Sequence, residues 1–245
     1  MPRKIIFSTG NYFKVYSDDN RKIDSCLKLD VEGVEILLAV ASQIKNFRLK
    51  KGNIKRLKKL ELNTIHLPFA LSAKKRYIYF YNSRIYRDMM KRVAKIADMI
   101  NAVNINLHAH QLKNPKLLAD FPFHYTFENI TESHGWGMND YKMLFKKNPE
   151  FGMLLDTSHA IRTCQLKEMV KNFRKKINFI HFSCATGPGH GNDHYMAHRY
   201  NEPNKKLLDA VKNLKCPVII EAGAEEGLTQ KDMEKEVAYV RKWLK

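Results

Sequence analysis

Short apolar runs alternate with longer amphipathic stretches along the whole chain. The short runs have the length of buried parallel strands, which read as nearly continuous hydrophobic segments because both of their faces are covered. They are Lys4–Ser8, Gly33–Leu38, Thr64–Leu67, Val103–Leu107, Tyr125–Glu128, Gly152–Asp156, Phe179–Phe182 and Pro217–Glu221. Apolar residues recur at helical spacing most clearly in Asn82–Asn101, Leu166–Lys175, Asn204–Asn213 and Thr229–Leu244. The pattern predicts repeated strand–helix units.

This repeat predicts an α/β fold with a parallel sheet, because parallel neighbours need crossover helices. Eight strand–helix units in 245 residues match the usual size of a (β/α)8 TIM barrel, roughly 250 residues. A doubly wound open sheet is the alternative, but no GxGxxG motif follows the first strand. Because no linker, internal repeat or low-complexity segment interrupts the chain, residues 1–245 are predicted to form a single TIM-barrel domain.

Composition narrows the class of protein. Hydrophobic residues make up 44% of the chain, which excludes wholesale disorder. No apolar run approaches the roughly 20 residues of a membrane helix, and the N-terminus has no signal-peptide pattern. We therefore expect a soluble, cytoplasmic protein that contacts no membrane. Its cysteines form no CxxC pair, which argues against a disulfide framework or a thiolate zinc site; they are Cys26, Cys164, Cys184 and Cys216.

The chain is strongly basic. Its 43 lysines and arginines against 25 aspartates and glutamates give a formal charge of +18. Such a charge favours polyanionic partners through counterion release and long-range steering. A lysine-rich solvated surface would give the same balance. The basic run Arg48–Lys59 precedes a strand and is expected to form a solvated helix face away from the chemistry.

Histidine and carboxylate side chains stand where the predicted strands end. All ten histidines lie between His66 and His198. The ends of six consecutive strands carry His66, His108, Glu128, Asp156, His181 and Glu221, and His159 follows Asp156 by three residues. In a barrel these ends converge on the face where active sites are built.

Such groups cannot stay unpaired in a dry pocket, because desolvation costs several kcal/mol for each of them. A divalent metal neutralises them most simply, and imidazole nitrogen with carboxylate oxygen suits zinc, manganese or iron. A single histidine at a strand end can instead be a hydrogen-bonded structural residue. Asp156, followed by Thr157 and Ser158, can be only a helix cap. The coincidence across consecutive strands predicts a metal site.

These residues resemble the endonuclease IV family within the wider xylose isomerase-like barrel superfamily. The similar segments cover the third to the eighth predicted strand, and the Leu-Asp-Thr-Ser-His-Ala stretch at 155–160 is the most specific of them. The others are His-Leu-Pro-Phe at 66–69, Asn-Leu-His at 106–108, Phe-Glu-Asn at 127–129, Ile-His-Phe at 180–182 and Val-Ile-Ile-Glu at 218–221.

The resemblance implies a hydrolase that holds up to three metal ions, often zinc and otherwise manganese, and cleaves damaged double-stranded DNA 5′ to an abasic site. His66 and His108 would bind the first metal, and Glu128 would bridge it to the second. The second metal would be completed by Asp156, His181 and Glu221. Glu128 and Glu221 would be the catalytic pair that places the metals and orients the attacking hydroxide.

The third implied metal would use His159 and an Asp-x-His element after the seventh strand, and here the match is incomplete. His194 fits the histidine, but the position two residues before it is Asn192. Either Asp193 takes the aspartate's place through a register shift, or Asn192 is a weaker neutral ligand. His190 is a further candidate.

The third strand-to-helix loop, 72–81, mixes cations with aromatic residues. Lysine and arginine there could hold phosphates, and an aromatic ring could fill the gap left by a flipped or missing base. The candidate DNA contacts are Lys74, Lys75, Arg76 and Tyr79. The alternative is a loop that packs its tyrosines on the barrel rim.

Two other functions remain open. Glu128, Asp156, His181 and Glu221 alone are the single-metal pattern of the ketose epimerases in the same superfamily, and two glutamates across one metal could shuttle a proton next to a carbonyl. The segment 33–36 also looks more like that branch, whose surplus histidines would bind a sugar. A barrel that binds nucleic acid without cutting it is the other alternative. The surplus of histidines beyond one metal favours the nuclease, and a monomer is the favoured state.

Overall fold

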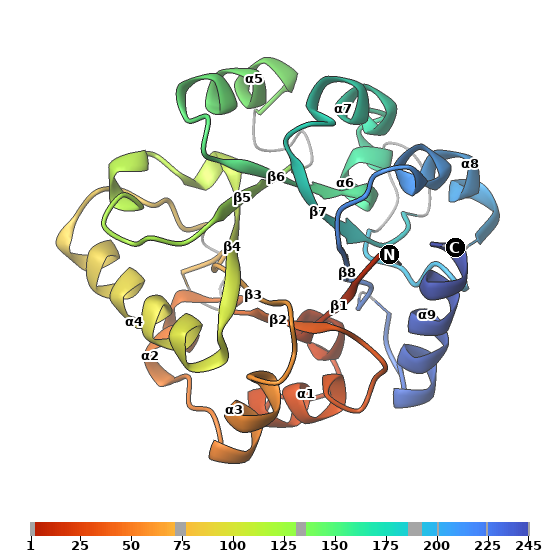
Figure 1. Cartoon of the computed structure of the whole chain (residues 1–245), viewed down its shortest axis with the longest axis horizontal. Helices are drawn as coiled ribbons and strands as arrows, with labels where there is room; N and C mark the ends of the chain where they lie inside the picture. Colours follow the sequence, from red (N-terminus) through yellow and green to blue (C-terminus); the bar gives the residue numbers. More distant parts are fainter. Residues whose placement is uncertain are drawn as a thin grey trace.

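Eight parallel strands close into a barrel in the computed structural model, which describes residues 3–71, 77–130, 136–185, 193–199, 201–223 and 225–244 (Figure 1). Each strand pairs with its neighbours in sequence, and β1 pairs with β8 to close the sheet. The strands are β1 (Ile5–Ser8), β2 (Gly33–Leu37), β3 (Asn63–His66), β4 (Ala102–His108), β5 (Tyr125–Glu128), β6 (Gly152–Asp156), β7 (Ile177–Phe182) and β8 (Val218–Ile220). The predicted (β/α)8 barrel is confirmed, and the open sheet is excluded.

Helices surround the barrel and follow the predicted amphipathic stretches (Figure 1). They are α1 (Asp19–Cys26), α2 (Ala41–Asn46), α3 (Lys51–Leu57), α4 (Arg84–Ile100), α5 (Met138–Lys147), α6 (Thr157–Arg162), α7 (Leu166–Phe173), α8 (Asn201–Lys212) and α9 (Gln230–Trp243). Short 3-10 turns are η1 (Thr9–Tyr12), η2 (Ala109–Gln111) and η3 (Pro115–Leu117). The predicted solvated basic face is α3, whose Lys51 and Lys55 are exposed.

Local sequence explains where the long helices begin and end. Thr229 and Asp232 form a reciprocal capping box at the start of α9. Helix α4 ends at Asn101, which adopts the left-handed conformation (φ 53°) that asparagine tolerates better than most residues. Apolar residues of α4, such as Met90 and Val93, are fully buried against the barrel. Local sequence therefore sets where the helix ends, and packing against the sheet holds the helix in place.

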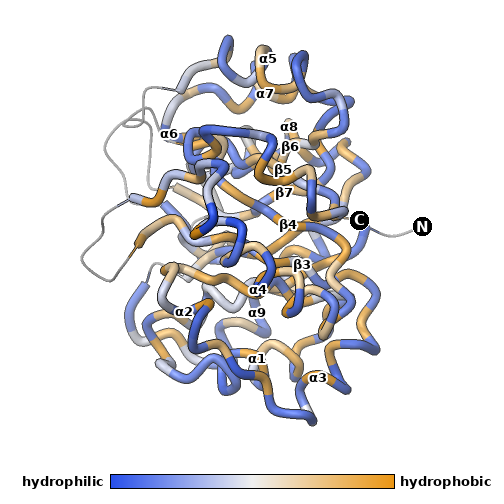
Figure 2. The backbone as a smooth tube through the Cα atoms, turned by 90° about the vertical axis from the view of Figure 1, so that its left-hand side faces the viewer, coloured by the Kyte–Doolittle hydropathy of each residue, from blue (hydrophilic) through white to orange (hydrophobic). Residues whose placement is uncertain are grey.

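The inside of the barrel divides into an apolar and a polar half. Ile6, Leu154, Phe179 and Ile219 form a separate buried cluster on β1, β6, β7 and β8. The facing strands β2 to β5 instead bury polar side chains, which are Glu35, Thr64, Asn104, Asn106 and Thr126. The large core lies between strands and helices, and Figure 2 shows hydrophobic residues concentrated on central strands such as β4, β5 and β7.

The four cysteines form no disulfide bond with one another. Cys26 and Cys184 are buried, whereas Cys164 is exposed. Within the described part of the chain, no helix is both long enough and apolar enough to cross a membrane.

Candidate metal centre

Ligand-type side chains gather at the carboxyl ends of the strands in three groups, and within each group the ligand atoms lie within 4.8 Å of one another. The groups are His66, His108 and Glu128; Glu128, Asp156, His181 and Glu221; and Asp156, His159 and His194. Glu128 belongs to the first two groups, and Asp156 belongs to the last two. The strands therefore bring together side chains from 66 to 221 in one continuous acid–imidazole cluster.

Glu128, at the end of β5, is the centre of this cluster and is almost completely buried. Its Oε2 lies 2.8 Å from His66 Nε2 and 3.3 Å from His108 Nε2. Its Oε1 lies 3.4 Å from His159 Nδ1 and 3.5 Å from His181 Nδ1. A carboxylate whose two oxygens face different sets of imidazoles could offer one oxygen to each of two metal ions.

Asp156 combines a helix cap with a place in the cluster. Its Oδ1 accepts hydrogen bonds from the His159 backbone N–H (2.7 Å) and from Ser158 Oγ (2.8 Å), so it caps α6. Its Oδ2 is buried and has no hydrogen-bond partner among the described residues. That oxygen lies 3.9 Å from Nδ1 of both His181 and His194. A buried carboxylate oxygen without a donor is costly unless a cation satisfies it. The helix cap predicted for Asp156 is confirmed, and its role as a metal ligand stays a prediction.

Fixed acceptors select which nitrogen of three histidines faces the cluster. His66 Nδ1 lies 2.8 Å from the carbonyl of Leu67, and His159 Nδ1 lies 2.9 Å from the carbonyl of Asn129. His181 Nε2 forms a hydrogen bond with Glu35 Oε2 at 3.3 Å. If each of these nitrogens donates its N–H, Nε2 of His66 and His159 and Nδ1 of His181 remain for a metal. Hydrogen bonds of this kind hold metal-binding imidazoles in one tautomer and orientation.

The charges in the cluster are strongly coupled. Burial alone would lower the pKa of His66 and His181, but nearby carboxylates raise both pKa values above the ordinary range. Burial would also lower the pKa of His159. The nearby carboxylates, Asp156 first among them, outweigh this effect and raise the pKa of His159 to about 10. Burial would raise the pKa of Glu128, yet the imidazole charges lower it well below its usual value. Protons on these imidazoles thus balance the carboxylates in the way that divalent cations would.

The third group differs in one residue from the expected set. His159 and His194 meet Asp156, whereas the carboxylate of Asp193 lies 2.5 Å from Arg162 Nη1 and 3.8 Å from His159 Nε2. His194 is held in the left-handed region (φ 60°), where a non-glycine residue is uncommon and marks a functional or strained site. Asn192 and His190 lie outside the described residues.

Of the four candidate DNA contacts, the structure describes Tyr79 alone. Lys74, Lys75 and Arg76 lie outside the described residues. Tyr79 is half-buried, and the Nζ of Lys113 sits 4.7 Å from the centre of its ring. Its ring centre also lies 6.2 Å from that of His110. Tyr79 therefore contacts Lys113 and His110, and its role toward DNA stays a prediction.

Two residues that support the cluster did not stand out in the sequence. Glu35 on β2 reaches across the barrel to His181. Asn129 accepts the backbone N–H of Asp156 at 2.7 Å and donates to its carbonyl at 2.9 Å, so it clamps β5 to β6. The signal for Glu35 was a charged residue inside an otherwise apolar strand. Asn129 had no signal beyond its place after Glu128.

Helix α9 anchors the segment that carries His194. Glu236, which is fully buried, accepts the backbone N–H groups of Ala197 (2.8 Å) and His198 (3.0 Å). It also lies 2.7 Å from the Nδ1 of His198. This carboxylate therefore fixes the chain three to four residues after His194.

A cavity of about 760 Å3 opens beside the third group. Asp193 and His194 line one end, and the rings of Phe13 and Phe69 line the wall with Lys22 nearby. Phe13 is 62% exposed, and the Nζ of Lys22 lies 5.9 Å from its ring centre. The cavity is large enough for a sugar or a nucleotide and offers aromatic faces to either.

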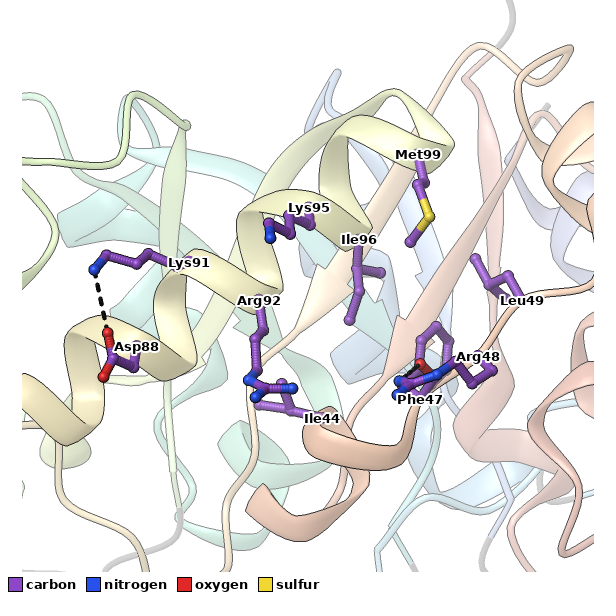
Figure 3. A pocket seen from close by; sticks show the side chains of 10 residues that line it. All are labelled: Ile44, Phe47, Arg48, Leu49, Asp88, Lys91, Arg92, Lys95, Ile96 and Met99. Carbon is purple, nitrogen blue, oxygen red and sulfur yellow. Dashed lines mark hydrogen bonds and ion pairs between the residues drawn. The ribbon is translucent and has the colours of Figure 1, made fainter.

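A second hollow, of about 570 Å3, lies on the flank between α2 and α4, away from the cluster (Figure 3). Its rim is basic, but Arg48 donates to the carbonyls of Lys45 and Phe47, and Lys91 pairs with Asp88 at 3.1 Å. Asp88 is its one residue of metal-ligating type among those that line it. This groove belongs to the charged exterior and not to the candidate metal centre.

Comparison with solved structures places this chain among (β/α)8 barrels of differing chemistry. An AP endonuclease of family 2 from Brucella melitensis superposes with a TM-score of 0.65 at 15% identity, over 98% of this chain and 99% of that one. A sugar phosphate isomerase/epimerase from Parabacteroides distasonis gives 0.67 at 13% identity, over 100% and 96%. D-psicose 3-epimerase from Clostridium cellulolyticum gives 0.60 at 14%, over 99% of each chain. At such identities the likeness shows the fold alone.

The sequence matches no protein-family profile and no curated protein. The neighbours therefore support the barrel and leave the choice between their activities to the side chains of the cluster.

Removing divalent metal should destabilise the protein. A ligand present at about a thousand times its dissociation constant adds about 4 kcal/mol to the free energy of unfolding. For a chain of this size that corresponds to a rise in Tm of roughly 10 °C. Differential scanning calorimetry of chelator-treated protein, before and after addition of Zn²⁺ or Mn²⁺, measures this. An unchanged Tm with both ions would contradict metal binding at the cluster.

Proposed function

We propose that this protein is a metal-dependent phosphodiesterase that hydrolyses double-stranded DNA 5′ to abasic sites. The observation that carries the proposal is the size of the cluster. Glu128, Asp156, His181 and Glu221 would be sufficient for one metal, yet four further histidines complete two adjoining groups. The first and third groups share a carboxylate with the second, which favours several metal ions side by side rather than one.

The proposed reaction assigns distinct roles to the chain's own carboxylates. Bound divalent ions, zinc in the first instance, would neutralise phosphoryl oxygens, supply hydroxide near neutral pH and stabilise the leaving alkoxide. Glu128 is only 1% exposed and acts by holding the cluster together. Glu221 is 15% exposed, so it is the more open of the two glutamates and can orient the attacking water and take its proton.

Charge supports a polyanionic substrate. The formal charge of +18 would attract DNA from a distance. Lys74, Lys75 and Arg76, which lie outside the described residues, follow His66 in the sequence and add to this charge. The exposed ring of Phe13 at the rim of the 760 Å3 cavity could stack on a base next to the lesion.

Cleavage and metal content together test the proposal. Purified protein is analysed for metal per chain and incubated with a labelled duplex that contains one abasic site, with an undamaged duplex as control. About three metals per chain and a nick at the abasic site support the proposal. A Glu221→Gln variant should bind the same duplex but lose most of the cleavage. Metal-loaded wild-type protein that leaves the abasic duplex intact would count against it.

A sugar isomerase or epimerase is the second candidate, and one observation favours it. Asp193 pairs with Arg162, so the third group holds Asp156 as its carboxylate without a further acid of its own. A cluster reduced to its four-residue group would bind one metal between two glutamates. This candidate predicts about one metal per chain and turnover of a ketose such as D-psicose in the absence of DNA. Salt-sensitive DNA binding without either reaction would instead indicate a non-cleaving barrel.

A further inference from the structure

A buried carboxylate lies beneath the metal centre in the polar half of the barrel. Glu35 has no exposed surface, and it lies on β2 between Val34 and Ile36, both of which belong to the core between strands and helices. Because side chains alternate along a strand, Glu35 points into the barrel. Bulky branched apolar residues usually fill such positions in TM barrels. A charge in this place needs a specific partner.

The partners of Glu35 connect β2 to the far side of the barrel. Its Oε2 accepts a hydrogen bond from Asn106 Nδ2 at 2.5 Å and from Thr64 Oγ1 at 3.5 Å. Asn106 Oδ1 in turn accepts a hydrogen bond from Thr126. The Nε2 of His181 lies 3.2 Å from Glu35 Oε1 and 3.3 Å from Oε2. His181 is thus the one cationic group in contact with Glu35 among the described residues.

His181 presents its two nitrogens to different surroundings. Nε2 faces Glu35, whereas Nδ1 lies 2.9 Å from Glu221 Oε2 and 3.5 Å from Glu128 Oε1. Nδ1 is buried and has no hydrogen bond of good geometry within the described residues. The ring therefore stands between Glu35 on one side and the three carboxylates of its ligand group, Glu128, Asp156 and Glu221, on the other.

We propose that Glu35 is a positioning residue for the metal centre, which accepts the Nε2–H of His181 and thereby presents its Nδ1 to the metal held with Glu128, Asp156 and Glu221. The carboxylate fixes the tautomer and the orientation of the ring and makes Nδ1 a stronger donor to the metal. Thr64 and Asn106 hold the carboxylate in turn. The role rests on the metal centre of the proposed function, but it is the same for a nuclease and for an epimerase.

Glu35→Gln tests this role with almost no change in volume. His181 Nε2 lies 3.3 Å from Oε2, the oxygen that also accepts from Asn106, and 3.2 Å from Oε1. In glutamine the oxygen that stays with Asn106 loses its negative charge, and an NH2 group takes the place of Oε1 beside Nε2. That arrangement favours the tautomer with the proton on Nδ1. A nitrogen that carries the proton cannot bind a metal. We expect zinc affinity at the weakened site to fall about 10- to 100-fold, measured by competition with a chromophoric chelator. The visible spectrum of the Co²⁺-loaded variant should change as well.

A second readout does not require metal. Two-bond ¹H–¹⁵N correlation spectra, recorded at alkaline pH so that the His181 ring is neutral, report which nitrogen of a histidine carries the proton. The signal of His181, assigned by its loss in a His181→Gln variant, should show a protonated Nε2 in the wild type. In Glu35→Gln it should show a proton on Nδ1 alone.

Glu32→Gln is the matched control, because Glu32 is a partly buried carboxylate whose hydrogen bonds among the described residues go to Ile5 and Arg241 and not to His181. It should lower the Tm but leave the affinity of the four-residue group within about twofold. Equal loss of zinc in both variants would overturn the positioning role, since general destabilisation would then explain it. Unchanged affinity and an unchanged His181 tautomer in Glu35→Gln would also overturn it. Wild-type protein that binds no divalent metal would overturn both the proposed function and this role, whereas a failure confined to Glu35→Gln would overturn only the latter.

Discussion

Replacing His66 with alanine should reduce cleavage at abasic sites by at least about 100-fold, the scale on which a single electrostatic contact to a reacting group usually acts. His66 Nε2 lies 2.8 Å from Glu128 in the first ligand group, which would keep only His108 and Glu128. One metal should therefore be lost per chain. Steady-state cleavage of the abasic duplex and elemental analysis of the same sample measure the two effects together.

The same variant separates the two candidate functions. His66 is absent from the four-residue group, so a single-metal epimerase should keep its metal. His124→Ala is the matched control, because His124 is exposed and lies outside all three groups. Full cleavage activity in His66→Ala would refute the clustered-metal mechanism.

Replacing Glu128 with glutamine should strongly lower the free energy of unfolding of the metal-free protein. This carboxylate is 1% exposed and faces His66, His108, His159 and His181 within 3.5 Å. Its removal leaves buried imidazoles without their shared counter-charge, and breaking a buried ion pair on one side typically costs about 3–5 kcal/mol. Urea unfolding of chelator-treated wild type and variant measures the difference in the free energy of unfolding.

The loss should depend on pH in a defined direction. The pKa values of His66, His159 and His181 are raised in the folded protein, so stability from their pairing is fully present below their unfolded values, about 6.5. It is lost as pH rises through the folded values, about 10 for His159. The gap between wild type and Glu128→Gln should be wide at pH 6 and narrower near pH 10. Glu150→Gln, on the exposed surface, should match wild type at both; a gap that widens with pH would contradict the pairing.

The fold could be predicted from the sequence, because the spacing of apolar residues and the lengths of the apolar runs reflect which residues are buried. The run 152–156 is fully buried as β6, and the amphipathic stretch that begins at Asn82 becomes α4. The grouping of His66, Glu128 and Asp156 was also predictable, since parallel strands in a barrel must end on one face. Strand limits shifted by a residue or two, so that Glu221 stands just after β8.

Contacts across the barrel and along loops were not predictable. Whether Asp193 or Asp156 completes the third group depends on Arg162, 31 residues away from Asp193, whose guanidinium competes for the carboxylate. The link between Glu35 and His181 spans 146 residues and passes through the barrel interior. No local pattern encodes which nitrogen of an imidazole meets which acceptor, because side-chain orientation is set by tertiary packing.

Because Glu236 binds His198, helix α9 supports the segment that carries His194 at the carboxyl end of the barrel. A shortened protein that stops before α9 would keep every strand and every ligand-bearing residue, yet its third histidine–acid group would lose the brace behind it. Tags and fusions at the carboxyl terminus should therefore leave α9 intact. A disturbed α9 would first weaken the binding of a metal ion at the group that contains His194.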